Sequence, residues 1–204
     1  MRKIYTVGGD THYANWMQGV DVYQMHLADL VVFTGGEDVG PSLYNKQRNP
    51  TTLSSSGRDY FEKHHFYQAK ELHKPMIGIC RGAQFLCVMS GGILVQNQDN
   101  PDFIHDIQLY DREPLRITST HHQAQFPFNL PVEDYKILGW TENLCGYHQG
   151  ESYEDEMNPP VECEIVHYPK TKCLGIQGHP EMMGECPTVN YLRKLLDKFL
   201  LNEL

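Results

Sequence analysis

The chain of 204 residues has 40% hydrophobic and 21% charged residues, a globular balance that excludes wholesale disorder. Its formal net charge of −9 at pH 7 disfavours a nucleic-acid or anionic-membrane partner, and no apolar run approaches the roughly 18 residues of a transmembrane helix. Because the amino terminus lacks a signal-peptide pattern, we expect a cytoplasmic protein that folds as one domain over residues 1–204.

The first half of the chain alternates predicted strands with predicted helices. Buried apolar runs predict strands at residues 3–7, 30–34 and 76–79. Helical patterns occupy residues 58–73 and 81–89. Strands that alternate with helices form parallel sheets covered on both faces, so the predicted fold class is three-layer α/β with a mostly parallel sheet.

The stretch before the longer helix and one face of that helix carry further expectations. Residues 41–57 are rich in Pro, Asn, Ser and Thr, which predicts an unusually long loop. In the helix that follows, Phe61, Ala69 and Leu72 are predicted to share one apolar face, with His64 on the surface.

The second half of the chain is predicted to be richer in strands. Strand candidates lie at residues 115–119, 135–138, 161–168 and 173–177, and the last two are predicted to form a hairpin. Apolar residues at helical spacing predict an amphipathic carboxy-terminal helix over residues 189–200.

Cys80 stands where a predicted strand runs directly into a predicted helix. Gly78 and Gly82 flank it, which suits a sharp turn because residues without a Cβ let the backbone pass closely. A thiol at a helix amino terminus is favoured as the reactive thiolate, and the amide of Arg81 is free to face an oxyanion. The alternative interpretation is a tight turn with an incidental buried cysteine.

The remaining cysteines show no pattern of metal or disulfide chemistry. No C-x-x-C pair and no zinc-finger spacing occurs, and without an export signal a disulfide framework is not expected. We therefore predict that most of these residues are small buried side chains, and that the chain has neither a metal site nor a cofactor; they are Cys87, Cys145, Cys163, Cys173 and Cys186.

The segment GICRGAQ (residues 78–84) resembles the nucleophile motif of class I glutamine amidotransferases, most closely their γ-glutamyl-hydrolase-like branch. Matching segments occur in the family's order at residues 34–39, 58–62, 91–92, 119–123 and 178–181. The resemblance covers most of the chain. It implies the flavodoxin-like fold of that family and a catalytic triad of Cys80, His179 and Glu181.

His179 and Glu181 also suit these roles by their positions. His179 follows a predicted strand, and imidazole titrates near neutral pH, as a general base must. Pro180 favours an extended backbone, in which side chains two residues apart lie on one side, so Glu181 can reach the imidazole. Taken alone, in a random protein, the tripeptide would more often be a surface turn.

The resemblance further implies a set of substrate-side groups. The amides of Gly36 and Arg81 would hold the oxyanion, and Gln84 would face the substrate's amino-acid end. His122 and Gln123 would line the pocket for the γ-glutamyl head. The alternative for the adjacent histidines is that His121 or His122 is a buried structural residue and the other is solvated.

Two features are specific to this chain. Gly178 replaces a residue that is often bulky and aromatic in the family, which predicts room for a leaving amine at the pocket mouth. Residues 151–156 are strongly acidic, and we expect them to form a solvated loop.

These residues predict a cysteine-nucleophile hydrolase that cleaves the γ-amide bond of glutamine or of a γ-glutamyl amine through a γ-glutamyl thioester. One alternative is a glutaminase subunit that donates ammonia to a separate synthetase, which would act in trans because the chain has no length left for such a domain. The other is a non-catalytic binding module, against which an intact triad weighs. The substrate and the oligomeric state remain open.

Overall fold

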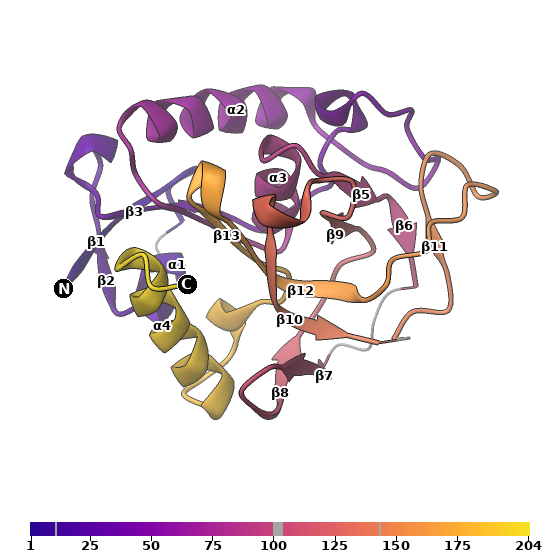
Figure 1. Cartoon of the computed structure of the whole chain (residues 1–204). Coiled ribbons are helices and arrows are strands. Elements are labelled where there is room, and N and C mark those ends of the chain that lie inside the picture. Colours follow the sequence, from indigo (N-terminus) through magenta and orange to yellow (C-terminus); the bar gives the residue numbers. More distant parts are fainter. Residues whose placement is uncertain (11, 100–103, 143) are drawn as a thin grey trace.

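A computed structural model describes residues 1–10, 12–99, 104–142 and 144–204. Its centre is a nine-stranded sheet (Figure 1). The strand order is β2 (Gly19–Asp21), β1 (Arg2–Thr6), β3 (Leu30–Phe33), β4 (Met76–Ile79), β13 (Cys173–Ile176), β12 (Glu162–Tyr168), β10 (Lys136–Thr141), β7 (Ile104–Leu109) and β8 (Arg112–Thr118).

The half of the sheet from β2 to β13 is parallel, and the half beyond β13 is antiparallel. β3, β4 and β13 are buried at every position, as expected for strands covered on both faces. β12 reverses direction against β13 through a 3₁₀ turn at Pro169–Thr171, so the predicted hairpin is confirmed. The predicted fold class is confirmed as well.

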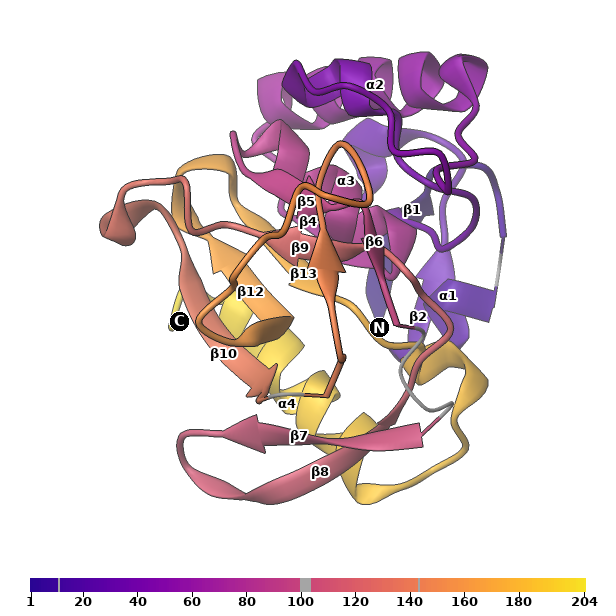
Figure 2. The ribbon, with the colours of Figure 1, turned by 90° about the vertical axis from the view of Figure 1, so that its right-hand side faces the viewer.

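Helices cover both faces of the sheet (Figures 1 and 2). On one face lie α2 (Ser56–Glu71) and α3 (Arg81–Met89), and on the other lie α1 (His12–Trp16) and α4 (Pro187–Leu200). Alternation along β4 supplies both cores: Met76 packs on the α2–α3 side, and Ile77 and Ile79 pack on the α1–α4 side.

Two small sheets hold the chain that crosses from β8 back to the α3 side. β5 (Ile93–Val95) pairs with β9 (Ala124–Phe126), and β6 (Asn97–Gln98) pairs with β11 (His148–Gln149). The amide of Gln98 also donates to the carbonyl of His122 at 2.9 Å. The connecting residues 119–123 are thereby fixed beside α3.

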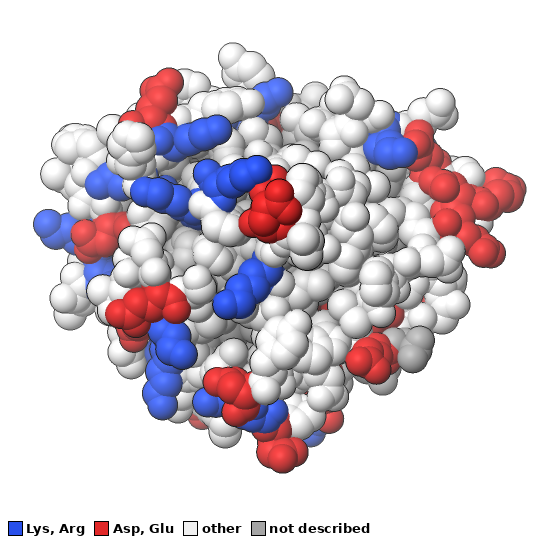
Figure 3. All heavy atoms as spheres, in the orientation of Figure 1, with Lys and Arg blue, Asp and Glu red and all other residues white. Residues whose placement is uncertain are grey.

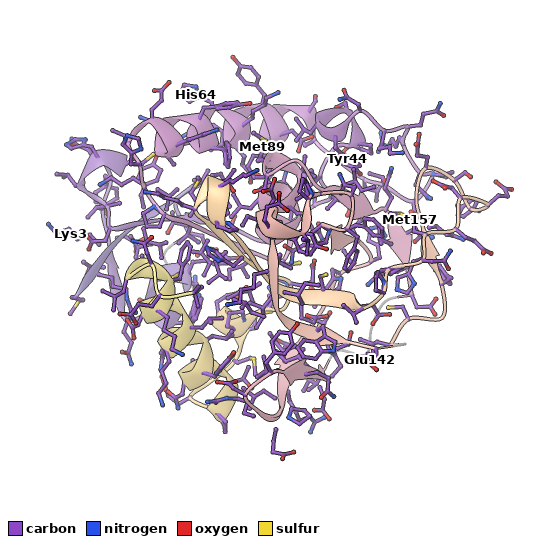
Figure 4. The ribbon with its side chains drawn as sticks, viewed as in Figure 1. Lys3, Tyr44, His64, Met89, Glu142 and Met157 are labelled. Atoms are coloured by element: carbon purple, nitrogen blue, oxygen red, sulfur yellow. The ribbon has the colours of Figure 1, made fainter. Side chains whose placement is uncertain are left out.

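The long loop and the helix after it differ from the prediction. Residues 41–57 contain a 3₁₀ turn at Pro41–Tyr44, and α2 begins at Ser56, two residues earlier than predicted, because the side chain of Ser55 caps it by accepting from the amide of Arg58. His64 lies on the outer side of α2, as predicted (Figure 4).

The predicted apolar face of α2 was wrong in two of its three members. Phe61 is 46% exposed and Leu72 is 38% exposed, whereas Ala69 is buried. The buried face instead carries Asp59 and Glu62 among its members. Hydrophobic spacing could not reveal this, because these carboxylates are buried by their ionic partners rather than by apolar character.

The carboxy-terminal helix α4 begins two residues before the predicted start and buries the predicted stripe. Its buried apolar residues are Val189, Leu192, Leu195, Leu196 and Phe199. Among the residues that the structure describes, every helix is too short or too polar to cross a lipid bilayer.

Candidate active site

Cys80 has a backbone conformation that few non-glycine residues adopt. Its φ is 51° and its ψ is −110°, between the end of β4 and the first residue of α3. Such strain is typical of functional sites when the surrounding structure fixes it. Here the amide of Cys80 donates to the carbonyl of Ile176 at 2.8 Å, which continues the β4–β13 ladder up to the turn.

The glycines beside Cys80 permit this turn, as predicted. A Cβ on Gly78 would lie 2.2 Å from the carbonyl oxygen of Gly82. A Cβ on Gly82 would lie 2.1 Å from the carbonyl oxygen of Phe33. Both contacts are with backbone, so a side chain at either position would force β3, β4 and α3 apart.

His179 and Glu181 form the contact that the sequence predicted, by a different geometry. His179 Nδ1 lies 2.7 Å from Glu181 Oε1, and both side chains are buried. Pro180 begins a 3₁₀ turn, Pro180–Met182, rather than an extended segment. The backbone of His179 is itself fixed, because its amide donates to the carbonyl of Thr118 at 3.0 Å.

The imidazole of His179 is held in a strongly polar environment. Burial alone would lower its pKa, but the Cys80 thiol and the Glu181 carboxylate together raise the pKa of His179 to about 10. The ring also lies with Nε2 at 3.0 Å from Thr120 Oγ1. A proton on His179 is therefore stabilised near neutral pH by both neighbours that the sequence had assigned to it.

Gly35 lies at the point where Cys80 and His179 meet. A Cβ on Gly35 would lie 3.0 Å from His179 Cε1 and 3.7 Å from Cys80 Cβ. The amide of Gly35 donates to the hydroxyl oxygen of Tyr13 at 3.0 Å. Burial, followed by the charge of Glu181, raises the pKa of Tyr13 to about 12, so this phenol stays neutral.

Gly36 lines the same cavity as Cys80, Arg81 directly follows Cys80 in the chain, and the backbone amides of both are candidate oxyanion donors. In the part of the chain that the structure describes, neither amide donates a hydrogen bond to a protein acceptor. Gly36 has a φ of 143°, which favours glycine, and Arg81 is the first residue of α3. Both positions therefore suit donors that face a developing oxyanion.

A cavity of about 280 Å³ brings most of the predicted site residues together. Glu181 stands behind His179 rather than in the wall, and Arg81 is buried beside Cys80. Gln84 is tied into the wall, because its Nε2 donates to the carbonyl of Gln123 at 2.7 Å. The lining residues are Gly36, Asp38, Cys80, Gln84, Thr120, His121, His122, Gln123, His179 and Met182.

The adjacent histidines have different environments, although both line the cavity. His122 Nε2 lies 3.1 Å from both carboxylate oxygens of Asp38, and this hydrogen bond raises the pKa of His122. His121 is buried, donates from Nδ1 to the carbonyl of Gln123 at 2.8 Å, and has its pKa lowered by burial to about 4. His121 therefore has the character of a neutral structural residue, and His122 that of a polar group at the mouth.

The expectation for Gly178 was wrong. Gly178 does not line the cavity, and a Cβ there would lie 2.5 Å from Ile117 Cδ1 and 2.7 Å from the carbonyl oxygen of Thr118. This glycine permits β8 and the chain after β13 to pack closely, so it leaves no room for a leaving group. The exposed large side chain of the wall is Met182, at 60% exposure.

Sequence reasoning missed four residues at the site: Tyr13, Asp38, Thr120 and Met182. Each contributes through proximity in space rather than through a local pattern. Thr120 had a signal, since it lies within the matched segment of residues 119–123. Asp38 had the same kind of signal, since it lies within the matched segment of residues 34–39. Tyr13 and Met182 had none beyond their polarity or size.

The other cysteines are free, as predicted, and four are buried while Cys186 is half-buried. Cys145, His148 and Glu162 place their ligand-type atoms within 4.8 Å of one another. The Glu162 carboxylate already accepts hydrogen bonds from the amides of Leu144 and Cys145, from Thr141 Oγ1 and from His148. The three residues lie close together because Thr141, Leu144, Cys145 and His148 all hydrogen-bond to this one carboxylate.

The acidic segment of residues 151–156 forms an exposed loop after β11, as predicted. Its carboxylates gather at one edge of the molecule (Figure 3). The carboxylate of Glu151 is not freely solvated, because it accepts from Lys46 Nζ at 2.9 Å and from the amide of Gln47 at 2.7 Å. The loop thus binds the long segment before α2.

Three solved structures of low sequence identity share this fold. The glutaminase domain of Trypanosoma brucei CTPS, with bound acivicin, aligns with a TM-score of 0.62 at 12% identity over 100% of this chain and 95% of its own. A glutamine amidotransferase from Thermotoga maritima aligns with a TM-score of 0.58 at 14% identity, over 100% and 86%. A protein described as a GMP synthase subunit, from Thermoplasma acidophilum, aligns with a TM-score of 0.57 at 18% identity, over 98% and 92%.

Sequence comparisons reach closer relatives. The glutamine amidotransferase-like protein YvdE of Lactococcus lactis is 30% identical over 180 residues, which cover 85% of this chain and 73% of the relative. Protein NtpR of Enterococcus hirae is 37% identical over 180 residues, covering 76% and 67%. The peptidase C26 family matches residues 17–128, a span that holds Cys80, Gln84 and Gln123. The chain therefore belongs to the peptidase C26 family of class I glutamine amidotransferase-like proteins.

Proposed function

We propose that this protein is a cysteine-nucleophile amidohydrolase that cleaves the γ-amide bond of glutamine or of a γ-glutamyl amine. The observation that carries the proposal is the strained φ of 51° at Cys80, beside the His179–Glu181 pair and two open amides. A cavity of about 280 Å³ suits an amino-acid-sized group better than a long polymer. Membership of the family supports hydrolysis of C–N bonds.

In the first step, the Cys80 sulfur attacks the γ-carbonyl carbon. The amides of Gly36 and Arg81 donate to the oxygen as its charge grows. His179, whose pKa is raised to about 10, holds the proton that the leaving amine needs. When the C–N bond breaks, the amine departs with that proton, and a γ-glutamyl thioester remains on Cys80.

In the second step, water replaces the amine. The neutral His179 takes a proton from water as the oxygen attacks the thioester carbon, and glutamate leaves. Glu181 holds Nδ1–H of His179 throughout, so Nε2 faces the reacting groups, and its charge stabilises the imidazolium. Gln84, His122 and Gln123 lie in the cavity wall, where they can orient the γ-glutamyl head.

A second candidate function is donation of ammonia to a synthetase in trans. It is favoured by two neighbours in fold, of which one is the CTPS glutaminase domain and the other is described as part of a GMP synthase. In this case the same chemistry at Cys80 would act on glutamine alone. The ammonia would pass to a separate protein instead of to solvent.

The test is glutamate release from glutamine and from a panel of γ-glutamyl amines by the purified protein. We expect Cys80→Ala to lower turnover by at least about 10³, with His179→Ala close to it because the two act as a unit. Glu181→Gln should have a smaller effect, since it weakens orientation without removing the base. Mass spectrometry of a rapidly quenched reaction should find the γ-glutamyl group on the Cys80 peptide.

Two outcomes would contradict the proposal. If His179→Ala kept more than about a tenth of the wild-type turnover, another base would have to act at Cys80. If the wild type released no glutamate from any compound of the panel, a non-catalytic role would replace the hydrolase.

A further inference from the structure

The amino-terminal turns of α2 and the start of α3 are joined by a buried network of charges. α2 lies directly over α3 in both views (Figures 1 and 2). The side chain of Arg81, at 1% exposure, donates to Asp59 Oδ1 at 2.7 Å and to Glu62 Oε2. The other oxygen of Glu62 accepts from Arg58 Nε at 2.9 Å. One carboxylate therefore ties both guanidinium groups together.

The network reaches the chain on each side of Gly36. Arg58 Nη2 donates to the carbonyl of Gly35 at 2.8 Å, and to the carbonyl and hydroxyl oxygens of Thr34 at 3.2 Å each. A Cβ on Gly36 would lie 2.0 Å from Arg58 Nη1, so the guanidinium packs directly against this glycine. The segment that carries one open amide is thus fixed by Arg58.

The same network fixes the far end of that segment and the second amide. Asp59 Oδ2 accepts from the amide of Gly40 at 3.1 Å. Arg81 supplies the second open amide through its own backbone, while its side chain is clamped by Asp59 and Glu62. Both candidate oxyanion amides therefore belong to residues that this one network contacts.

The packing of α2 against α3 does not by itself require charged side chains. Arg81, Asp59 and Glu62 lose their hydration here, while Arg58 stays 25% exposed. Well-packed apolar residues of similar size are often as stabilising as buried ion pairs. Burial raises the pKa of Asp59 although Arg81 opposes the shift, which reflects that loss of hydration. What apolar residues could not supply is directional bonding to the carbonyls of Thr34 and Gly35 and to the amide of Gly40.

We propose that Arg58, Asp59, Glu62 and the Arg81 side chain are positioning residues that set the separation of the Gly36 and Arg81 amides. This inference rests on the proposed hydrolase function, in which these amides hold the oxyanion. None of the four side chains lines the cavity. They act through the backbone, so they affect the transition state and leave substrate binding largely unchanged.

The test compares Arg58→Met and Glu62→Gln with Glu71→Gln, an exposed position of the same helix. We expect kcat to fall about 10- to 100-fold in the first two variants, which is no more than the fall caused by removing one oxyanion donor. KM should stay within about twofold. Glu71→Gln should match the wild type. Arg58 is the safer variant because its side chain is 25% exposed and the Glu62–Arg81 pair remains.

Alkylation of Cys80 by iodoacetamide separates positioning from general damage. This reaction needs the thiolate but develops no oxyanion, so its rate should be unchanged in Arg58→Met while kcat falls. If alkylation slowed in step with kcat, or if both variants kept the wild-type kcat, the inference would be overturned.

If the wild type is inactive on every γ-glutamyl compound, the proposed function is wrong. Amide hydrogen exchange still tests the network in that case. Exchange of residues 34–40 should then be at least about 10-fold faster in Arg58→Met than in Glu71→Gln, because the bonds that hold this segment are lost. Equal exchange in the two variants would overturn the network's role.

Discussion

At the scale of single residues, the sulfur atoms of the six cysteines have different surroundings. Burial raises the pKa of Cys87, Cys145 and Cys173 to about 12 and places the pKa of Cys163 well above its ordinary value. These thiols stay protonated at pH 8, and the protonated form is unreactive. Cys80 instead lines a cavity next to His179.

We therefore expect iodoacetamide at pH 8 to label Cys80 before any of the four buried thiols, as read by peptide mapping over a time course. Cys186 is half-buried, so its labelling rate serves as the reference for a thiol that the reagent can reach. Cys186→Ser should leave the labelling rate of Cys80 unchanged. First labelling at Cys87 or Cys173 would remove the assignment of Cys80 as nucleophile.

Protonation of His121 makes the stability of the fold depend on pH. Burial lowers its pKa to about 4, against the opposing charge of Glu164. A histidine whose folded pKa is depressed contributes stability that is fully present above its unfolded pKa of about 6.5 and is lost as pH falls toward 4. The pKa values of His179 and His122 are raised, so the stability that these two residues contribute is fully present below about pH 6.5. Their contributions are therefore not lost as the pH falls from 6.5 toward 4.

Urea unfolding at pH 7 and at pH 5 should show this effect. We expect the wild type to lose more stability between the two values than His121→Gln, by roughly 2 kcal/mol, since the pKa of about 4 leaves His121 mostly neutral at pH 5. The other titratable groups are present in both proteins, so their contributions cancel when the two stability losses are compared. Equal losses would mean that His121 takes up its proton in the folded state without cost.

At the scale of elements, the turn between β4 and α3 depends on close backbone contact. A Cβ at Gly78 or Gly82 would lie within 2.2 Å of a carbonyl oxygen, and a backbone atom cannot move aside as a flexible side chain can. Gly78→Ala should therefore lower both the free energy of unfolding and the turnover, the former by more than about 2 kcal/mol.

Gly184→Ala is the matched control, because nothing lies within 4 Å of a Cβ at that position. Its free energy of unfolding should stay within about 0.5 kcal/mol of the wild type. Urea titrations and turnover on the same preparations measure both effects. A stable and active Gly78→Ala would show that the turn adapts, and the strain at Cys80 would lose its structural cause.

The elements that the sequence predicted well are those whose burial follows from apolar character. β3 and β4 are apolar at every position apart from Gly78, and the hydrophobic stripe of α4 repeats at helical spacing. β7 was missed because its buried positions include His105, which is not read as apolar. β2 and α1 were missed because three and five residues are too few for a periodic pattern.

The candidate site shows the same division. Cys80, His179 and Glu181 were predicted because each lies in a short motif, and the structure brings their side chains together. Tyr13 and Met182 were not, since only the fold brings them to the site, and Asp38 was overlooked although it lies in the matched segment of residues 34–39. Gly178 was misjudged because the sequence shows that a side chain is absent there but not which neighbouring atoms occupy the space.

At the scale of the whole molecule, one chain assembles every group that the proposed reaction uses. The oxyanion amides come from the loop after β3 and from α3, and the His179–Glu181 pair comes from the chain after β13. Buried hydrogen bonds within the chain fix each of these segments. Within the described residues, the groups of the proposed mechanism are therefore held by the chain's own hydrogen bonds.

We therefore expect the isolated protein to be fully active, with a turnover of about 1–10³ s⁻¹ on its preferred γ-glutamyl amide. A glutaminase that must not waste glutamine behaves differently, because its site is completed only when its partner binds. Turnover should also be independent of protein concentration and of added cell extract. Negligible activity alone, with acceleration by a copurifying protein of synthetase size, would favour ammonia donation in trans, since the oxyanion amides would then need that partner to reach their working positions.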